Sequence, residues 1–229
     1  MISVYCFSGS GHSKKIADFF CEKLNCEMRM ISEVLTDRDL QCETAVVVFP
    51  VYCQSIPKPV KRFLKKLTAK YLVLISTYGK ISYGNVLYEA KKLSSGEVIG
   101  AAYIPMGHTF LKGNLDFDSN AVLPILERIK HPKTANIPRN FKNIFADFFP
   151  AWRSRLGVKI IKTSACNSCN SCGSHCSMNA IYKGNINSKC IRCLRCVSNC
   201  PQKALLFENK LPLKKYLEKH YKDEVKLYL

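Results

Sequence analysis

Eight cysteines fall into two short runs with the same spacing, and these runs restrict the fold of their segment more than any other feature. The spacing is C-x2-C-x2-C-x3-C in both runs. The members are Cys166, Cys169, Cys172 and Cys176, followed by Cys190, Cys193, Cys196 and Cys200. Three thiolates at this spacing wrap around one 4Fe–4S cluster, and the fourth cysteine ligates the neighbouring cluster. The sequence therefore predicts two clusters, one held by Cys166, Cys169, Cys172 and Cys200, the other by Cys190, Cys193, Cys196 and Cys176.

Two other uses of closely spaced cysteines fit this pattern less well. A zinc site closes at four ligands and usually takes them from two C-x2-C pairs, so a third cysteine in each run is surplus. A disulfide framework needs an oxidising compartment. Ser177 stands where proline follows the fourth cysteine of the second run, which affects loop stiffness but not the ligand count. The repeat continues into Ala180-Ile181 and Ala204-Leu205.

The length of the chain leaves room for a larger domain ahead of the cysteines. Of its 229 residues, the cysteine segment takes only about fifty, too few to bury much apolar core without metal or disulfides. The upstream part, about 130 residues, suits a complete α/β domain. A hydrophobic content of 47% is typical of a packed globular protein rather than a disordered one.

The sequence lacks the signals of secretion or membrane insertion. The apolar start at Ile2–Phe7 is interrupted by Ser8-Gly9-Ser10-Gly11, which a secretory signal does not tolerate. No apolar stretch reaches the length of about 18 residues that a transmembrane helix needs. The cysteines outside the two runs are expected to be free thiols: Cys6, Cys21, Cys26, Cys42 and Cys53. We therefore expect a cytoplasmic protein in a reducing environment.

The formal charge of +18 indicates an affinity for anions. Two 4Fe–4S clusters with their thiolates would subtract about four units and leave the protein strongly basic. Such a field favours acidic proteins, phosphate-bearing ligands, anionic membrane surfaces or nucleic acid, without choosing among them. Because no recognition motif accompanies the charge, we expect no nucleic-acid partner. A nucleic-acid-binding redox sensor is kept only as a weaker hypothesis.

In the first part of the chain, short apolar runs alternate with segments whose apolar residues recur at helical spacing. The expected strands are Ser3–Phe7, Cys26–Ile31, Ala45–Phe49, Tyr71–Ser76 and Val98–Tyr103. The expected helices are Ser13–Leu24, Pro57–Leu67, Asn85–Leu93 and Asn120–Ile129. Alternation of this kind predicts a five-stranded, doubly wound parallel sheet of the α/β class. Ligands of such sheets bind at the carboxyl ends of the strands, so the loops after the first, third and fourth strands are candidate binding loops.

The loop after the first strand has the composition of an anion site. It reads Ser8-Gly9-Ser10-Gly11-His12-Ser13. Its glycines allow backbone amides to turn toward an anion, its serines can donate to phosphate oxygens, and a helix N-terminus follows. Lys14 and Lys15 lie at the positive end of the helix dipole, where cations are unfavourable. Either a bound phosphate or simple solvation of the two lysines would relieve this repulsion. A dinucleotide fingerprint and a P-loop both fit worse, and no second dinucleotide motif indicates direct use of NAD(P)H.

The other two loops carry tyrosines beside glycine, proline or hydroxyl residues. They run from Pro50 to Pro57 and from Thr77 to Asn85, and contain Tyr52, Tyr78 and Tyr83. A tyrosine at a strand end can stack on a flat ring, although singly it is more often a loop anchor or part of the core. Together, three loops on one sheet edge predict a pocket for a phosphorylated planar cofactor.

With these loops the chain resembles a flavodoxin, and with the cysteine runs it resembles the family of flavodoxin–ferredoxin fusion proteins of anaerobic bacteria and archaea. The resemblance covers nearly the whole chain except about the last twenty residues. It implies FMN, two 4Fe–4S clusters and electron transfer, with an α/β flavodoxin-like domain and a small α+β ferredoxin domain. The FMN-binding residues that it implies are Ser8, Gly9, Ser10, Gly11, His12, Ser13, Pro50, Val51, Tyr52, Thr77, Tyr78, Gly79, Tyr83, Gly84 and Asn85.

The resemblance also implies roles and shows two departures. Serines of the first loop would bind phosphate, and Tyr52 with either Tyr78 or Tyr83 would flank the isoalloxazine ring. His12 replaces the usual asparagine or threonine, so its protonation could make phosphate binding depend on pH. The sequence Ile104–His108 replaces the family's usual motif after the fifth strand, and that loop is therefore left out of the predicted site.

We expect four segments: a flavodoxin-like domain at 1–135, a basic aromatic linker helix at 136–160, a ferredoxin domain at 161–208 and a helical tail at 209–229. The linker's aromatic and aliphatic residues share one helical face: Phe141, Ile144, Phe145, Phe148, Phe149 and Trp152. Pro150 would kink or end this helix. The face is expected to pack on the larger domain or to bridge the two domains, with contact to a membrane surface as the alternative.

The predicted function is electron transfer between FMN and two 4Fe–4S clusters, with an acidic redox protein or enzyme as partner. Such a protein joins two-electron to one-electron chemistry and needs no general acid or base. The alternative is an FMN-dependent reductase that acts on a small anionic substrate at the flavin and draws electrons through the clusters. The sequence does not decide between carrier and oxidoreductase, and it assigns no catalytic residue.

Overall fold

The computed structural model describes the chain except residues 38, 111–116, 144–149 and 219–222, and it describes only the backbone of 150–153 and 212. It divides into two compact units. The sheet unit comprises Met1–Ser8, His12–Ala146 and Tyr221–Leu229, and the cysteine unit comprises Gly9–Gly11 and Asp147–His220. Each unit is described by itself.

A six-stranded sheet with the order β10-β5-β4-β3-β1-β2 forms the centre of the sheet unit. Its strands are β1 (Ile2–Cys6), β2 (Met28–Met30), β3 (Gln41–Pro50), β4 (Thr68–Tyr78), β5 (Glu97–Pro105) and β10 (Lys226–Tyr228). The first five are parallel, and β10 pairs antiparallel with β5. The order 2-1-3-4-5 is one of the two common doubly wound orders and has its switch point between β1 and β3. The predicted α/β class and parallel sheet are confirmed, and the predicted strand count of five is one too low.

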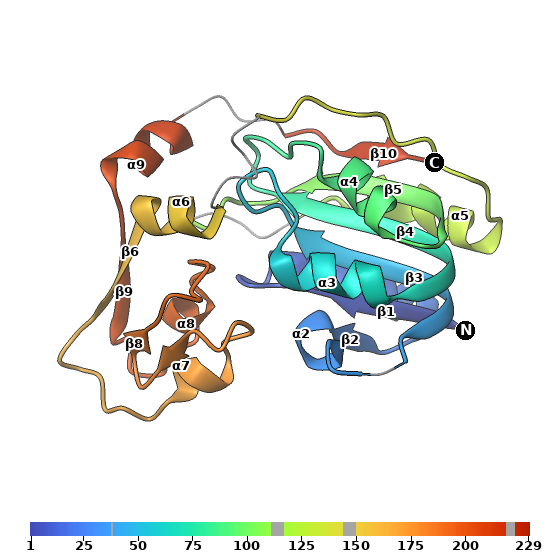
Figure 1. Cartoon of the computed structure of the whole chain (residues 1–229). Coiled ribbons are helices and arrows are strands. Elements are labelled where there is room, and N and C mark those ends of the chain that lie inside the picture. The colour runs from blue at the N-terminus through green and yellow to red at the C-terminus, as the bar shows by residue number, and fades with distance from the viewer. Residues whose placement is uncertain (38, 111–116, 144–149, 219–222) are drawn as a thin grey trace. The chain divides into compact units, whose positions relative to one another are not determined.

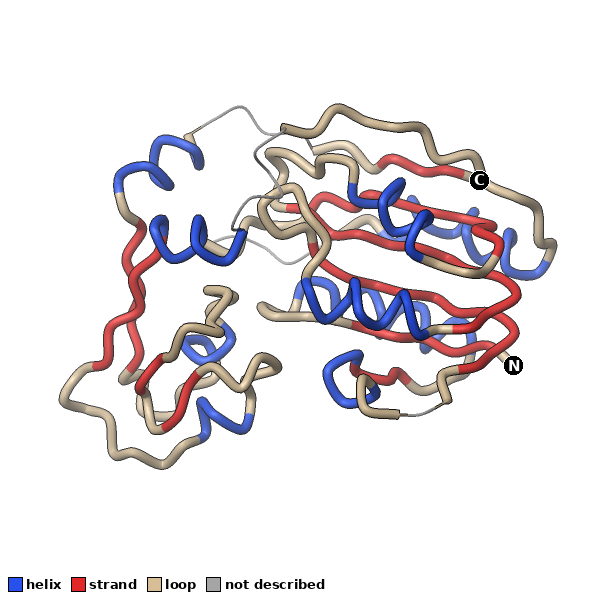
Figure 2. Tube along the Cα trace, viewed as in Figure 1, coloured by secondary structure: helices blue, strands red, loops and turns tan. Residues whose placement is uncertain are grey.

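Helices cover both faces of this sheet, as Figures 1 and 2 show. The helical elements are α1 (His12–Leu24), α2 (Ile31–Val34), α3 (Lys58–Lys66), α4 (Val86–Leu93), a 3₁₀ turn (Ser119–Val122) and α5 (Leu123–Lys130). Residues of α1 and α5, such as Ile16 and Ile125, pack with Val4, Val46 and Val73 of the sheet. Because both faces are covered, β3 is buried without interruption from Ala45 to Phe49, as its apolar run predicts.

The antiparallel strand β10 was not predicted from the sequence. The tail from residue 209 was expected to be helical, and the structure has the helix α9 only at Leu211–Leu217. After the residues that the structure does not describe, the tail pairs Lys226 with Tyr103 and Tyr228 with Ala101. The strand was missed because of its length, since three residues are too few to show a periodicity.

The cysteine unit is built from short elements. It contains α6 (Pro150–Gly157), β6 (Val158–Lys162), α7 (Ser171–Ser174), β7 (Ile181–Tyr182), β8 (Asn185–Ile186), α8 (Arg195–Ser198), β9 (Leu205–Asn209) and α9. Strand β6 pairs antiparallel with β9, and β7 pairs antiparallel with β8. Three buried residues, Cys172, Ile181 and Leu205, form its apolar cluster, and three further cysteines pack around them. The unit therefore has little apolar core apart from its cysteines.

The predicted linker helix is wrong in its first part. Residues 141–143 are not helical, and Phe141 is 89% exposed. Four of the residues of the expected aromatic face, Ile144, Phe145, Phe148 and Phe149, lie outside the described residues. Helix α6 begins at Pro150, where the sequence was expected to kink or end a helix. Proline is favoured at the first position of a helix because its missing N–H has no intrahelical partner there.

One buried hydrogen bond in the sheet unit is expected to contribute to the stability of the protein. The Leu87 amide donates to the hydroxyl oxygen of Tyr103, at 2.8 Å, and Tyr103 is fully buried. Tyr103→Phe keeps the ring but leaves this amide without its acceptor. We expect a loss of about 1–3 kcal/mol in the free energy of unfolding, measured by urea denaturation. Tyr71→Phe, on a half-buried ring of the same sheet, is the matched control and should change stability by less than about 0.5 kcal/mol.

Candidate functional site

The eight repeated cysteines line two cavities in the cysteine unit. The first cavity is lined by Cys166, Cys169, Cys172 and Cys200, and the second by Cys176, Cys190, Cys193 and Cys196. Each cavity thus takes three sulfurs from one run and one from the other. The residues predicted to share a cluster line the same cavity. No three His, Cys, Asp or Glu side chains in the described part of the chain are placed to hold a single metal ion.

Backbone geometry repeats between the two runs with an offset of 24 residues, which is the distance from Cys166 to Cys190. Residues with positive φ occur in equivalent pairs: Ser168 and Arg192 (60° and 57°), Asn170 and Leu194 (61° and 60°), Asn179 and Lys203 (48° and 49°). Helices α7 and α8 occupy equivalent places. The first run therefore wraps its cavity in the same way as the second run does.

Backbone amides point at several of the cysteine sulfurs. Ala180 N lies 3.2 Å from Cys176 Sγ, and its repeat partner Ala204 N lies 3.3 Å from Cys200 Sγ. Gly184 N lies 3.3 Å from Cys172 Sγ. Hydrogen bonds of this kind stabilise thiolates and raise the reduction potential of a cluster that the thiolates hold. The matching pairs Ala180-Ile181 and Ala204-Leu205 in the sequence are buried at equivalent places of the repeat.

Burial, with a smaller contribution from charge repulsion, opposes ionisation of the sulfurs when no metal is present. Burial, reinforced by neighbouring Cys176 and Cys190, raises the pKa of Cys193 to about 11. Burial, reinforced by Cys193 and other cysteines, raises the pKa of Cys196 to about 12. A cationic iron core offsets this cost, since metal coordination deprotonates thiols outright. The donor set, four sulfurs around each small cavity, fits a cluster of iron and sulfide.

Within the sheet unit, the ends of the first predicted FMN loop meet the second and third loops at the carboxyl edge of the sheet. The Ser13 and Thr77 hydroxyls of the first and third loops share a hydrogen bond of 2.8 Å, and both residues are buried. Val51 N donates to Thr77 O at 2.7 Å, which joins the second loop to the third. The rings of Phe7 and Tyr52 meet edge to face with 6.5 Å between centroids. The contact of Phe7 with Tyr52 lies at the switch point between β1 and β3.

The first loop keeps the features expected of an anion site. Ser8 is buried, and Gly11 has a φ of +99°, with nothing within 4 Å of where a Cβ would stand. His12 is the first residue of α1, and burial lowers its pKa. His12 is therefore neutral near pH 7. Lys14 forms an ion pair with Asp18 at 2.8 Å on the exposed side of α1, as the solvated alternative implied.

The second loop contains a two-residue turn in a strained conformation. Tyr52 and Ser55 exchange two backbone hydrogen bonds, of 3.0 and 2.9 Å. Between them Cys53 and Gln54 both have positive φ, 51° and 61°, which is the pattern of a type I′ turn. This turn favours Asn-Gly, so cysteine and glutamine are unfavourable here. Such strain clusters at functional sites.

The three predicted tyrosines differ in their burial and in their contacts within the protein. Tyr78 is 2% exposed, and its hydroxyl donates to Glu224 O at 2.8 Å. Tyr83 stacks on Tyr103 at 4.1 Å between centroids, and Lys226 lies 5.7 Å from the centre of the Tyr83 ring. Tyr52 and Tyr83 are both half-buried, whereas Tyr78 is buried. The rings of Tyr52 and Tyr83 are therefore more exposed than that of Tyr78.

The structure adds residues that sequence reasoning missed. His108 packs on Gly79, because a Cβ on Gly79 would come within 2.4 Å of the His108 ring. Gly84, with a φ of +60°, lies against Gln54 in the same way, at 2.8 Å. The loop with His108 was left out because it lacks the family's motif. The close contacts of Gly79 and Gly84 explain why glycine is needed at both positions.

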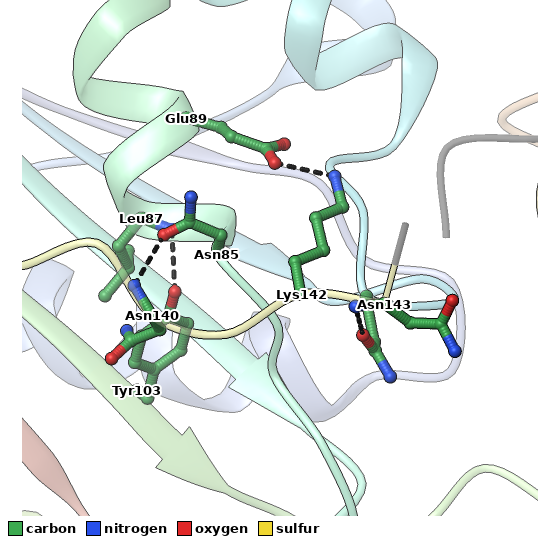
Figure 3. Close-up of polar contacts among 8 residues, drawn as sticks. Asn85, Leu87, Glu89, Tyr103, Asn140, Lys142 and Asn143 are labelled. Carbon is green, nitrogen blue, oxygen red and sulfur yellow. Dashed lines mark hydrogen bonds and ion pairs between the residues drawn. The ribbon is translucent and has the colours of Figure 1, made fainter. Parts of the chain in front are cut away.

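A strap, residues 135–143, runs from β5 to these loops. Its start is fixed by Ala135 N, which donates to Val98 O at 2.8 Å. Figure 3 shows its end, where Asn140 N donates to Asn85 Oδ1 at 2.9 Å and Lys142 pairs with Glu89 at 2.6 Å. Asn143 N donates to Gln54 Oε1 at 3.1 Å. The predicted site residue Asn85 therefore has its side-chain oxygen occupied by the strap.

Another cavity lies elsewhere in the sheet unit. It has a volume of about 880 Å³ and is lined by residues of α1 and α5, including Leu24, Leu126 and Arg128, and by Leu229. None of the predicted FMN residues lines it. Because the last turn of α1 lies at the opposite end from the first loop, we assign the functional site from the converging loops and not from this cavity.

Comparison with known proteins identifies part of the cysteine unit. Residues 186–206 match the family model of the 4Fe-4S binding domain. This segment contains the whole second cysteine run, so the chain carries a 4Fe–4S binding domain. No curated protein matches the chain in sequence. A solved structure, that of the Trp repressor binding protein from Bacillus subtilis, is similar with 14% identity and a TM-score of 0.35, over 59% of this chain and 100% of its own. Nothing below depends on that similarity.

Burial of His108 makes stability depend on pH. Burial, with a smaller effect of His12, lowers the pKa of His108 from 6.5 to about 4. The unfolded chain therefore binds this proton between pH 6.5 and 4 while the folded chain does not, so stability is complete above 6.5 and falls toward 4. We expect a loss of about 1 kcal/mol per pH unit in that window.

The test compares His108→Asn with the parent protein by hydrogen exchange of β4 and β5 amides. Asparagine can still accept from Phe110 N, which lies 3.3 Å from His108 Nδ1. The variant should show a shallower loss of protection from pH 6.5 to 4, whereas His131→Asn, on the exposed end of α5, should not. Equal slopes for all three proteins would contradict the buried neutral histidine.

Proposed function

We propose that the protein is an electron-transfer protein that carries FMN and two 4Fe–4S clusters and exchanges electrons with a redox partner in a reducing, cytoplasmic environment. The observation that carries the proposal is the crosswise lining of the two cavities. Iron–sulfur electron transfer follows from the 4Fe-4S binding domain at 186–206. The second cluster, the flavin and the partner are the proposed parts.

The second cluster is supported by the repeat. Each cavity draws one sulfur from the run that supplies three to the other, so Cys176 of the first run belongs to the second cavity. Equivalent φ values show that the first run is folded like the run that matches the family model. Cys172, Gly184 and Asn170 surround the first cavity with a buried thiol, an amide donor and a polar wall. This environment suits a cluster as well as that of the second cavity does.

FMN is supported at its phosphate end more than at its ring. Ser8, Ser13 and the open Gly11 backbone suit an anion at the start of α1. His12, neutral through burial, can donate one hydrogen bond and keeps that ability through neutral pH. On the ring side we propose Tyr52 and Tyr83, because Tyr78 is buried with its hydroxyl bonded. Bound FMN supplies two-electron and one-electron chemistry, and the clusters carry single electrons.

We propose that the residues of the site position and protect the cofactors, since electron transfer needs no general acid or base. The strap and the Tyr52–Ser55 turn hold the second and third loops in fixed conformations. Amide donors near Cys172, Cys176 and Cys200 set the electrostatic environment of the sulfurs. In the described residues no helix is long and apolar enough to cross a membrane.

The crosswise ligand set gives a direct test. In Cys200→Ser the first cavity loses one of its four sulfurs while the second keeps all four. We expect the iron content to fall from about eight to about four per chain, with loss of the magnetic coupling between two reduced clusters in the electron paramagnetic resonance spectrum. Cys176→Ser should do the same through the other cavity. Cys42→Ser, a half-buried cysteine of β3, should keep all the iron. Full iron in Cys200→Ser would disprove the assignment.

The flavin is tested by comparing two ligands that differ only in the phosphate. Anaerobic titration of the flavin-free protein with FMN and with riboflavin, followed by flavin fluorescence, gives both affinities. Ser10→Ala should weaken FMN by about tenfold through the loss of one hydrogen bond to a charged oxygen, and leave riboflavin unchanged. Ser95→Ala, on the loop before β5, is the control.

Failure of the parent protein to bind FMN would remove the flavin from the proposal and leave an iron–sulfur carrier. Rapid oxidation of the reduced, fully loaded protein by a small anion, without a protein partner, would instead favour the reductase alternative.

A further inference from the structure

The two cysteine loops have the same fold but different charge. Lys189, Arg192 and Arg195 stand in and beside the second loop. The equivalent positions in the first loop, 24 residues earlier, hold Ala165, Ser168 and Ser171. Because Ser168 and Arg192 share a φ near +60°, the backbone does not account for the difference. The repeat thus provides an internal control, and three cations distinguish the second loop.

A fourth cation extends this group. Arg155 of α6 donates through Nε to Cys190 O at 3.2 Å and through its guanidinium to Ser188 O. Arg192 Nε donates to Val158 O at 3.1 Å, and its Nη1 is buried without a hydrogen-bond partner among the described atoms. These guanidinium groups contact neutral carbonyl oxygens. Neither Arg155, Lys189 nor Arg192 forms an ion pair with a carboxylate within the described part of the chain.

The charge exceeds what a cluster would neutralise. A 4Fe–4S core with four thiolates carries about −2, against four cations around the second loop. Lys189 is exposed, and Arg155 and Arg195 are partly exposed, so the surplus reaches solvent. The first cavity also has cations nearby, Lys162, Lys183 and Lys203, but they come from β6, the β7–β8 turn and the segment before β9. Lys162 Nζ donates to Lys183 O at 3.0 Å.

We propose that the second cysteine loop, with Arg155, Lys189, Arg192 and Arg195, is the docking surface for an acidic redox protein that exchanges electrons with the second cluster. This inference rests on the proposed function. Arginine forks suit the carboxylates of a protein, and complementary charge speeds association. A protein with a carboxylate patch is favoured over a bilayer, since the three residues that distinguish the second loop from the first are all cationic and add no apolar side chain.

The test variant converts the second loop into the first: Lys189→Ala, Arg192→Ser and Arg195→Ser. The control variant removes three charges beside the other cavity: Lys162→Gln, Lys183→Gln and Lys203→Gln. Both proteins are loaded with cofactors, reduced anaerobically and mixed in a stopped-flow instrument with ferricyanide or with hexaammineruthenium(III). Each acceptor ion takes up one electron, ferricyanide becoming ferrocyanide and the ruthenium(III) complex becoming the ruthenium(II) complex. Cluster potentials measured by spectroelectrochemistry correct for driving force.

We expect the test variant to react with ferricyanide about tenfold more slowly at low salt, and the difference to vanish at high salt. The control variant should slow by less than threefold, and the cationic acceptor should not be slowed in the test variant. Poly-L-glutamate should inhibit the parent protein's reaction with ferricyanide and inhibit the test variant much less. Equal slowing of test and control variants would overturn the assignment to the second loop.

Two further arms check the class of partner. Vesicles with anionic phospholipid, or duplex DNA, that inhibit at lower concentration of charge than poly-L-glutamate would overturn the acidic-protein partner. The proposed function fails separately: a parent protein that binds no iron or sulfide gives no cluster signal to follow. Normal cluster content with unchanged kinetics in the test variant rejects only the docking surface.

Discussion

The exchange of one sulfur between two cysteine runs is the constraint on which the cysteine unit depends. Each cavity is lined by three cysteines of one run and one of the other, so neither site is complete without both. The buried residues of the unit's own apolar cluster are Cys172, Ile181 and Leu205. Units this small usually need metal ligation because apolar burial is insufficient. We therefore expect binding of the proposed clusters and folding of this unit to be one process.

The sheet unit depends on a different interaction, the packing of four tyrosine rings beside strands β4 and β5. Tyr103 stacks on Tyr83 and meets Tyr78 and Tyr228 edge to face. The last strand, β10, brings Tyr228 and Lys226 to this group, and Glu224 accepts from Tyr78. The same contacts that complete the sheet also fix the third binding loop. The family resemblance offered Tyr78 or Tyr83 as a flavin neighbour, and this packing leaves Tyr83 as the more accessible of the two.

Long apolar runs and ligand spacing made most of the fold predictable. Ala45–Phe49 is apolar at every position, and a strand covered on both faces needs that pattern. The cysteine spacing predicted which sulfurs would share a cavity because the path around a cluster allows few alternatives. Strand β10 was missed because three residues carry no periodicity. His108 and the strap were missed for another reason: their roles arise from contacts with Gly79 and Asn85 that lie far away in the sequence.

In both units, some residues adopt backbone conformations that their residue types disfavour. Leu194 and Arg192 adopt a left-handed backbone that favours glycine or asparagine, and Asn170, the repeat partner of Leu194, shows the preferred choice at the same place. Cys53 and Gln54 likewise occupy a turn suited to Asn-Gly. A residue in such a conformation costs about 1–3 kcal/mol and persists only where its surroundings hold it. Around the cavities, ligation of a cluster by cysteines of both runs can hold such a residue in its conformation. At Cys53-Gln54, the hydrogen bond from Asn143 N of the strap to Gln54 can do the same. The strained positions therefore coincide with the loops that the proposed cofactors require, which is where selection for binding outweighs selection for stability.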